Sequence, residues 1–160
     1  MGSGKTTLAQ TLSSTLSIPW IDTDVIIEET QKSTISELFK VSESHFRSIE
    51  SSICFQLKDI KNSVISTGGG IVLNSKNREI LKSLGLVVFL DVSLNTVLSR
   101  LQDDESRPLL RVSNREKVIQ SLLDERRALY EETASLTIET DTRTIHDISD
   151  MIIEKLNHYD

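Results

Sequence analysis

The run Met1-Gly2-Ser3-Gly4-Lys5-Thr6-Thr7 at the start of the chain constrains the fold more than any other feature. It matches the second half of G-x-x-x-x-G-K-[ST], a loop between a β-strand and an α-helix whose backbone N–H groups wrap nucleotide phosphates. In the full pattern the lysine reaches the β- and γ-phosphates, and the hydroxyl after it ligates Mg²⁺. The first glycine of the pattern and its strand do not stand in this sequence. A glycine-rich turn before a helix with a surface lysine is therefore the simpler alternative.

The residues after the loop predict an amphipathic helix. Leu8, Leu12 and Leu16 recur every fourth residue, which gives the segment from Lys5 to Leu16 one apolar face. A phosphate loop is normally mounted on such a helix. The residues expected to contact a nucleotide are Gly2, Ser3, Gly4, Lys5, Thr6 and Thr7.

Composition narrows the class of protein. With 160 residues, the chain fits one domain, 1–160. The formal net charge is -6 and no window clusters Lys and Arg densely, so no nucleic-acid partner is expected. No apolar run approaches the ~20 residues of a membrane span, so no membrane partner is expected either. Cys54 is the only cysteine, which excludes an internal disulfide and favours a reducing compartment, with the cytoplasm as the expected location.

Short apolar runs alternate with helical patterns along the chain. Strands are expected at 20–22, 64–66, 86–90 and 136–139. Helices are expected at 5–16, after Asp24, after a capping box at Thr34 and Glu37, and at 42–59, 74–85, 93–102, 114–130 and 144–156. The run at 86–90 is apolar throughout, which is typical of a parallel strand covered on both faces. The alternation predicts an α/β fold with a parallel sheet.

Two aspartates, Asp22 and Asp24, follow the first expected strand. Open α/β sheets bind ligands at the carboxyl ends of their strands. One carboxylate could hold Mg²⁺ through water while the other accepts a proton from a substrate hydroxyl, a division of labour that phosphoryl transfer requires. The alternative is structural, namely an Asx turn in which one of the two aspartates caps the next helix.

Two arginines lie in patterns that indicate an anionic ligand. Arg47 and Glu50 are three residues apart on one helix, and Glu50 lies inside its apolar stripe, where a lone carboxylate is costly, so the two are expected to pair. Arg126 follows Val118 and Leu122 on another apolar stripe. Two guanidinium groups that face one cleft would suit a small carboxylate substrate. Each arginine alone fits an ordinary ion pair equally well.

Three further features have both a structural and a functional interpretation. The glycines at 68–70 form either a flexible turn or a place where backbone approaches a ligand. The polar segment 103–113 forms either a solvated turn or a mobile lid that carries Arg107. Arg100 and Arg143 either flank an adenine or extend into solvent.

Taken in order, these segments resemble shikimate kinase, a P-loop enzyme similar to the nucleoside monophosphate kinases. The resemblance spans nearly the whole chain, and the order and spacing of its motifs make it specific. The segments that carry it are Gly2-Ser3-Gly4-Lys5-Thr6, Asp22-Thr23-Asp24, Phe46-Arg47-Ser48-Ile49-Glu50, Gly68-Gly69-Gly70, Arg107-Pro108-Leu109-Leu110 and Arg126-Arg127-Ala128-Leu129-Tyr130. The proline that this family often has before the final Leu-Tyr pair is missing, which affects helix geometry rather than charge.

The resemblance implies ATP-dependent phosphorylation of the 3-hydroxyl of shikimate, in aromatic amino acid biosynthesis. It implies that Asp24 orients or deprotonates that hydroxyl. The positions that match substrate-binding residues of the family are Asp24, Arg47, Gly69 and Arg126.

The same resemblance implies how ATP and Mg²⁺ are bound. Lys5 and Arg107 would stabilise the charge of the transferring phosphoryl group and, with Asp24, form the catalytic set. Arg143 would lie on the nucleotide side, in the loop that faces adenine. Thr6 would ligate Mg²⁺ and Asp22 would assist through water.

The family fold is a three-layer P-loop sandwich with sheet order 2-3-1-4-5, an arginine-bearing lid, here 103–113, and a shikimate-binding helical segment, here about 28–57. Members typically work as cytoplasmic monomers. The strand missing here is the central one, so its neighbours are expected to be unpaired, with a slot between them. Met1 is therefore expected to be an internal methionine of a longer natural chain. The rival functions are another small-molecule P-loop kinase, of the gluconate type, and a non-catalytic nucleotide-binding module or truncated product.

Overall fold

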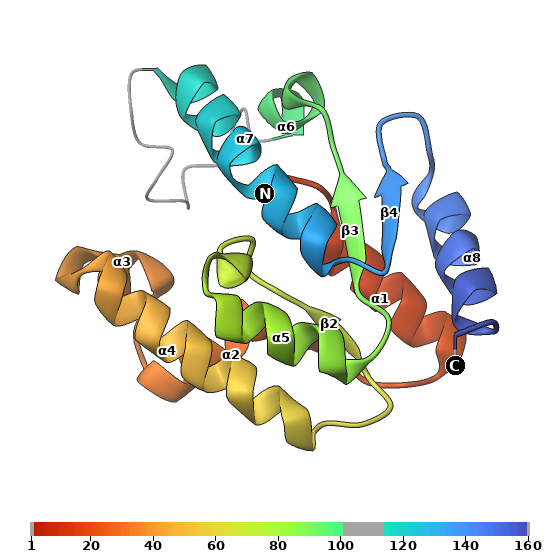
Figure 1. The fold of residues 1–160 in the computed structure, drawn as a ribbon, viewed down its shortest axis with the longest axis horizontal. Coiled ribbons are helices and arrows are strands. Elements are labelled where there is room, and N and C mark those ends of the chain that lie inside the picture. The colour runs from red at the N-terminus through yellow and green to blue at the C-terminus, as the bar shows by residue number, and fades with distance from the viewer. Residues whose placement is uncertain (1, 101–113, 160) are drawn as a thin grey trace.

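The computed structural model describes residues 2–100 and 114–159, whose arrangement Figure 1 shows. The helices are α1 (Lys5–Leu16), α2 (Thr23–Gln31), α3 (Ile35–Val41), α4 (Glu43–Gln56), α5 (Ser75–Leu84), α6 (Leu94–Arg100), α7 (Arg115–Thr133) and α8 (Ile145–Leu156), with 3-10 turns η1 (Leu57–Asp59) and η2 (Ile71–Leu73). The strands are β1 (Trp20–Asp22), β2 (Val64–Ser66), β3 (Val88–Asp91) and β4 (Leu136–Glu139). The expected lid at 103–113 lies outside the described residues.

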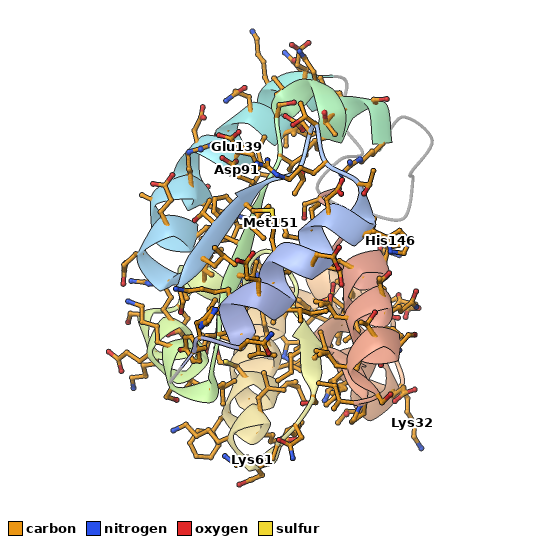
Figure 2. The ribbon with its side chains drawn as sticks, turned by 90° about the vertical axis from the view of Figure 1, so that its right-hand side faces the viewer. Lys32, Lys61, Asp91, Glu139, His146 and Met151 are labelled. Atoms are coloured by element: carbon orange, nitrogen blue, oxygen red, sulfur yellow. The ribbon has the colours of Figure 1, made fainter. Side chains whose placement is uncertain are left out.

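The four strands form two separate parallel pairs. β1 pairs with β2, and Asp22 lies opposite Ser66 at their carboxyl ends. β3 pairs with β4, and Asp91 lies opposite Glu139, side by side in Figure 2. Among the described residues no ladder joins β2 to β3. The predicted α/β class with parallel strands is confirmed, as is the expectation that the sheet is interrupted at its centre.

Helix α1 packs against both strand pairs. Its buried Leu8 and Leu12 share one core cluster with Leu90 of β3 and Ile138 of β4, and Val64 of β2 packs against the same cluster. α8 lies beside α1 and completes this cluster (Figures 1 and 2). The apolar stripe predicted for α1 is thus what holds the two halves of the interrupted sheet together.

Two further hydrophobic clusters hold other helices in place. One involves α5 and α7, and the other lies within the group formed by α2, α3 and α4. One cluster joins Cys54 of α4, Ile71 and Val72 of η2 and Leu81 of α5, with Leu129 of α7 packed against it. A separate cluster joins α2, α3 and α4 and consists of Ile27, Leu38, Phe46 and Ile53. Figure 1 shows this group at the end of the molecule away from β4 and α8.

Most predicted helix starts are confirmed with their expected caps. Thr34 and Glu37 form a capping box at α3, and the side chain of Asn74 accepts the backbone N–H of Lys76 at α5. α5 ends at Gly85, whose φ of 148° favours glycine. No helix in the described part of the chain is long and apolar enough to cross a membrane.

Two predicted boundaries were wrong. The third strand begins at Val88 rather than Leu86, because the Val87 carbonyl accepts the N–H groups of both Ser135 and Leu136 and the regular ladder starts only after it. Helix α7 continues past Tyr130 to Thr133. The physical reason is that the residues added to α7 keep their helical hydrogen bonds, and the Thr133 hydroxyl donates to the Leu129 carbonyl.

Candidate active site

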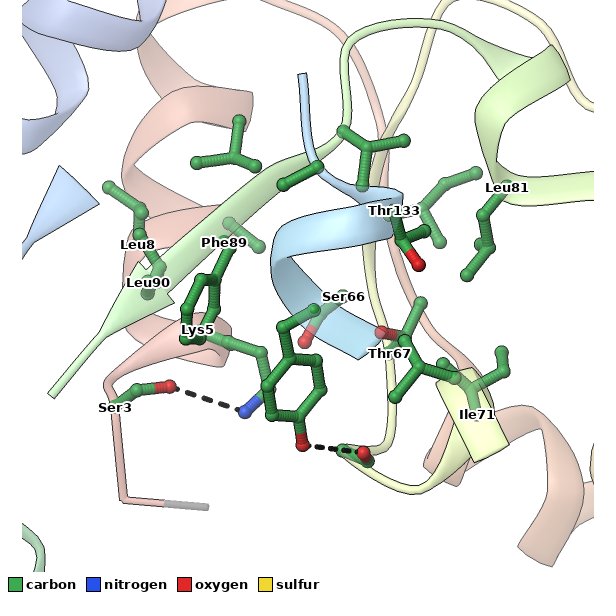
Figure 3. Close-up of a pocket in the computed structure, with 18 of the residues that line it drawn as sticks. Ser3, Lys5, Leu8, Ser66, Thr67, Ile71, Leu81, Phe89, Leu90 and Thr133 are labelled. Carbon is green, nitrogen blue, oxygen red and sulfur yellow. Dashed lines mark hydrogen bonds between the residues drawn. The ribbon is translucent and has the colours of Figure 1, made fainter. Parts of the chain in front are cut away.

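The phosphate loop has the backbone that its glycines predict. Gly2 and Gly4 have φ of 62° and 82°, in the left-handed region that favours glycine, and Gly4 is the N-cap of α1. Ser3 is buried between them, and the Lys5 ammonium donates to its hydroxyl across 3.3 Å (Figure 3). Backbone N–H groups in such a turn, next to a helix N-terminus, favour an anion. The interpretation as a surface lysine does not fit this geometry.

The two carboxylate oxygens of Asp22 have different partners. Its Oδ1 accepts the backbone N–H of Asp24 at 3.0 Å, which is the N-cap of α2. Its Oδ2 accepts the hydroxyl of Thr6 at 3.1 Å. A carboxylate of β1 therefore meets the first turn of α1 beside the phosphate loop. The helix cap therefore uses only Oδ1 of Asp22, whereas Oδ2 contacts Thr6 beside the phosphate loop.

The predicted phosphate-binding residues line one cavity of about 170 Å³ together with Asp24 and Gly69, whereas the predicted substrate-binding residues Arg47 and Arg126 are not part of its lining. Its wall consists of the phosphate loop and the carboxyl ends of β1 and β2, and the residues are Gly2, Ser3, Gly4, Lys5, Thr6, Thr7, Asp22, Asp24, Ser66, Thr67, Gly68 and Gly69. This is the strand edge at which open α/β sheets bind ligands.

Thr6 and Asp22 offer oxygen donors that suit Mg²⁺. The described residues contain no cluster of three or more His, Cys, Asp or Glu side chains that could hold a metal by themselves. Mg²⁺ commonly takes only one or two protein ligands and completes its shell with phosphate oxygens and water. The pair formed by the Thr6 hydroxyl and the Asp22 carboxylate fits that chemistry.

The glycine run makes room for two charged side chains. A Cβ on Gly68 would lie 2.6 Å from Oδ1 of Asp24, and a Cβ on Gly70 would overlap the guanidinium of Arg47. The N–H of Gly68 also donates to the Thr23 hydroxyl at 3.2 Å, which ties this run to the start of α2. The backbone of this run therefore lies directly against the side chains of Asp24 and Arg47, which requires glycine at 68 and 70. The run is more than a flexible turn.

Arg47 is held by two carboxylates and two rings. Its Nη1 donates to Glu50 at 2.8 Å, as predicted, and its Nη2 donates to Glu43 at 3.1 Å. Its guanidinium also lies over Phe39 and Phe46, 5.7 and 5.2 Å from their centroids. These contacts fix a group that would otherwise have many rotamers.

The carboxylate of Glu50 is affected by the charges of Asp24, Arg47 and Arg126. Its side chain is 3% exposed. Burial raises the pKa of the Glu50 carboxyl, and the charge and hydrogen bond of Arg47 oppose this shift. The charge of Asp24 also raises the pKa of Glu50, whereas that of Arg126 lowers it. Arg47 and Arg126, which are far apart in sequence, thus act on the same carboxylate.

One N–H group of the Arg126 guanidinium makes no hydrogen bond within the described residues. Its Nε is buried and, within the described part of the chain, has no hydrogen-bond partner. One turn later on α7, the hydroxyl of Tyr130 donates to the Gly69 carbonyl at 2.6 Å. Burial raises the pKa of the Tyr130 hydroxyl, and the charge and hydrogen bond of Arg126 oppose this shift. Buried polar atoms normally have partners, so the Nε–H of Arg126 can still donate a hydrogen bond to an anion.

The remaining arginines differ in how the structure places them. Arg100 donates from Nη1 to the Gly2 carbonyl at 3.0 Å, so it supports the phosphate loop. Arg143 is exposed and donates to the Glu139 carbonyl at 2.9 Å, two residues before Ile145, whose side chain faces Gly4. Arg107 lies outside the described residues.

Four features of the site were missed in the sequence. Glu43 is four residues before Arg47, so the helical i,i+4 rule could have found that contact. The bond from Tyr130 to Gly69 joins two elements that are distant in sequence, and no local spacing indicates it. A Cβ at Gly68 would collide with Asp24, and a Cβ at Gly70 would collide with Arg47. Because both side chains come from other elements, no sequence signal distinguishes these two glycines from Gly69.

This chain is similar over almost its whole length to members of one protein family. The family model described as shikimate kinase matches residues 1–157. The shikimate kinase of Actinobacillus pleuropneumoniae serotype 5b is 35% identical over 159 residues, which cover 99% of this chain and 92% of that protein. A structure of shikimate kinase from Acinetobacter baumannii in complex with shikimate has a TM-score of 0.94 and 36% identity, covering 99% of this chain and 89% of that one.

A more distant likeness concerns the fold alone. A gluconokinase from Sinorhizobium meliloti has a TM-score of 0.62 with 15% identity, over 99% of this chain and 87% of that one. At that identity the shared fold carries no information about the acceptor.

Proposed function

This chain belongs to the shikimate kinase family, and from that premise we propose that it transfers the γ-phosphoryl group of ATP to the 3-hydroxyl of shikimate, forming shikimate 3-phosphate in aromatic amino acid biosynthesis. The observation that carries the proposal is that one cavity joins the phosphate loop to Asp24, while the charges of Asp24, Arg47 and Arg126 all act on Glu50. On this proposal, a phosphate donor and a carboxylate-bearing acceptor would bind in adjoining parts of the site.

The acceptor side is built for a small carboxylate with a hydroxyl group. Arg47 and Arg126 would bind the shikimate carboxylate, which would also supply the partner that the buried Nε of Arg126 lacks. The backbone at Gly69, held by Tyr130, would form the floor of the site. Asp24 would accept or orient the proton of the 3-hydroxyl as its oxygen attacks the γ-phosphorus.

The donor side is built for a nucleotide triphosphate. The N–H groups of the loop, from Gly2 to Thr7, would bind the phosphates, and Lys5 would neutralise charge on the transferring group. Arg107 would add a second positive charge, and Arg143 would contact the adenine side. Thr6 would ligate Mg²⁺ and Asp22 would hold it through water. The metal would neutralise phosphate charge and orient the phosphate oxygens.

We extend the proposal to the organisation of the chain. Residues 1–160 would act as one domain, with 28–57 as the shikimate-binding segment and 103–113 as the lid. The enzyme would work as a monomer in the cytoplasm. The single cysteine, Cys54, is buried and free, which fits a reducing compartment.

A coupled assay of ADP release tests the function. The chain is incubated with Mg²⁺ and ATP together with shikimate, gluconate or no acceptor, and we expect release only with shikimate. The variant Lys5→Met, which removes the loop ammonium, should abolish the shikimate-dependent rate. Release with gluconate and none with shikimate would assign the gluconate-type activity instead. Binding of ATP with no release in any mixture would favour the non-catalytic module.

A further inference from the structure

Each carbonyl group of the glycine run at 68–70 accepts a hydrogen bond. Those of Gly68 and Gly70 accept backbone N–H groups of η2, at 3.2 and 3.0 Å. The Gly69 carbonyl instead accepts the hydroxyl of Tyr130, which lies 61 residues further along the chain on α7, at 2.6 Å (dashed line in Figure 3). The middle peptide of the run is therefore held by a side chain, which a substitution can change without altering the run itself.

This hydrogen bond orients more than one carbonyl group. The peptide between Gly69 and Gly70 is trans, so the C=O of Gly69 and the N–H of Gly70 lie on opposite edges of one rigid plane. A hydroxyl that holds this C=O therefore also sets the direction of the N–H. Gly69 lines the cavity shared by the phosphate loop and Asp24, so the direction of this plane determines which backbone groups the cavity presents to a ligand.

The guanidinium of Arg126 acts on the same hydroxyl. Arg126 lies one helical turn before Tyr130, so both side chains share a face of α7. Burial raises the pKa of the Tyr130 hydroxyl, whereas the charge and the hydrogen bond of Arg126 lower it. Because a guanidinium can only donate, the phenol oxygen accepts from Arg126 while its own hydrogen is donated to Gly69. One hydroxyl thus joins two groups that are proposed to bind shikimate.

The ring that carries this hydroxyl is held by its neighbours. It stacks on Phe89 of β3, with 4.9 Å between the ring centroids and 27° between the ring planes. It also packs against the hydrophobic cluster that joins α4, η2 and α5. A tyrosine side chain has few rotatable bonds, so contacts of this kind fix the position of its oxygen before a ligand binds.

We propose that Tyr130 is a positioning residue for shikimate, whose hydroxyl holds the Arg126 guanidinium and the peptide after Gly69 in one fixed arrangement. The group that binds the carboxylate and the backbone beside it would then meet the acceptor together. Tyr130 acts through these two groups and does not itself take part in the transfer. The inference rests on the proposed function, since it assigns a role at the acceptor side of that site.

Removal of the hydroxyl alone tests this inference. Tyr130→Phe keeps the ring and its stacking on Phe89 but releases both Arg126 and the Gly69 carbonyl. We expect the KM for shikimate to rise on the order of five- to tenfold, the effect of losing one hydrogen bond. The KM for ATP and kcat should stay within about twofold of their original values, because ground-state and transition-state binding of the acceptor are weakened alike.

Thr133→Val is the matched control, because it also removes a hydroxyl from α7. The Thr133 hydroxyl donates to the Leu129 carbonyl at 2.6 Å, within the helix. Both variants lose a hydrogen bond, so a role in stability alone would lower Tm in both and leave the KM for shikimate unchanged in both. A rise in this KM in Tyr130→Phe alone supports the positioning role, and equal KM values in the two variants would overturn it.

A double-mutant cycle tests the connection between Tyr130 and Arg126. The Kd of shikimate is measured by calorimetry for Tyr130→Phe, for Arg126→Ala and for the combination. In the Arg126→Ala background, Tyr130→Phe should weaken binding by a smaller factor than it does alone, because one of the two groups that the hydroxyl holds is gone. Equal factors in the two backgrounds would show that the residues act independently and would contradict the proposal.

The kinetics of the unsubstituted chain separate this inference from the proposed function. If that chain releases no ADP in response to shikimate, the proposed function fails and this inference fails with it. If it does release ADP and Tyr130→Phe has an unchanged KM for shikimate, only the role of Tyr130 is refuted.

Discussion

Nη1 of Arg47 lies 2.8 Å from a carboxylate oxygen of Glu50, and this ion pair forms on the buried side of α4. Glu50 is almost fully buried, whereas Arg47 retains 21% exposure of its side chain. Removing either partner of a buried pair leaves the other uncompensated, so such pairs are costly to break. Here the pair holds one guanidinium beside Gly70, where the substrate is proposed to bind.

The first prediction concerns the two adjacent arginines of α7. Arg126→Ala should weaken shikimate binding by on the order of 2–4 kcal/mol and leave ATP binding intact, because its guanidinium is proposed to bind only the carboxylate. Arg127→Ala is the matched control, since Arg127 pairs with Asp91 and Glu131 at the surface. Calorimetric titration with each ligand checks this. An equal loss of both affinities in Arg126→Ala would contradict the assignment.

The second prediction concerns Gly70. In Gly70→Ala the new methyl group would displace the Arg47 guanidinium, at a cost of about 1–3 kcal/mol typical of overpacking. We therefore expect the KM for shikimate to rise about tenfold or more while that for ATP is unchanged. Gly85→Ala is the control, because it strains a backbone with φ of 148° in open space. It should lower Tm without affecting either KM.

The third prediction concerns pH and Glu50. Burial raises the pKa of Glu50 in the folded chain above its value in the unfolded chain. The folded chain therefore binds this proton more tightly, and the free energy of unfolding should fall as pH rises through the interval between the two values. Glu50→Gln should remove this component of the slope, whereas Glu43→Gln, at an exposed carboxylate, should retain it. Urea unfolding from pH 4 to 8 measures the difference, and identical slopes in the two variants would refute it.

The fourth prediction concerns Cys54. Burial raises the pKa of its thiol to about 11, and the residue is fully buried. At pH 8 only about one thiol in a thousand would be ionised, since the thiolate fraction falls tenfold for each pH unit below the pKa. Iodoacetamide should therefore leave the native protein unlabelled at pH 8 and label it rapidly in urea. Mass spectrometry distinguishes the two, and fast labelling of the native protein would be inconsistent with this environment.

The fifth prediction concerns Thr6. Thr6→Val removes the hydroxyl that lies 3.1 Å from Asp22 and is proposed to ligate Mg²⁺. The Mg²⁺ concentration for half-maximal activity should rise on the order of tenfold or more. Thr11→Val is the control, because that hydroxyl donates only to the Thr7 carbonyl within α1. An unchanged Mg²⁺ dependence in Thr6→Val would remove Thr6 from the metal site.

The sequence alone determined the local elements and the chemistry of single residues. The leucine spacing predicted α1, the Thr34 and Glu37 box predicted the start of α3, and the position of Glu50 in an apolar stripe predicted its pairing with Arg47. These features depend on residues within about one helical turn of each other, where spacing fixes geometry. The roles of Arg107 and of the lid stay predictions.

Only the tertiary structure decided what the elements bring together. The start of β3 depends on how the chain enters the ladder with β4, and the meeting of Tyr130 with Gly69 depends on where α7 crosses the glycine run. The need for glycine at 70 arises from a side chain on α4, and the slot arises from the separation of β2 and β3. Contacts between residues far apart in sequence are set by packing, which no local spacing encodes.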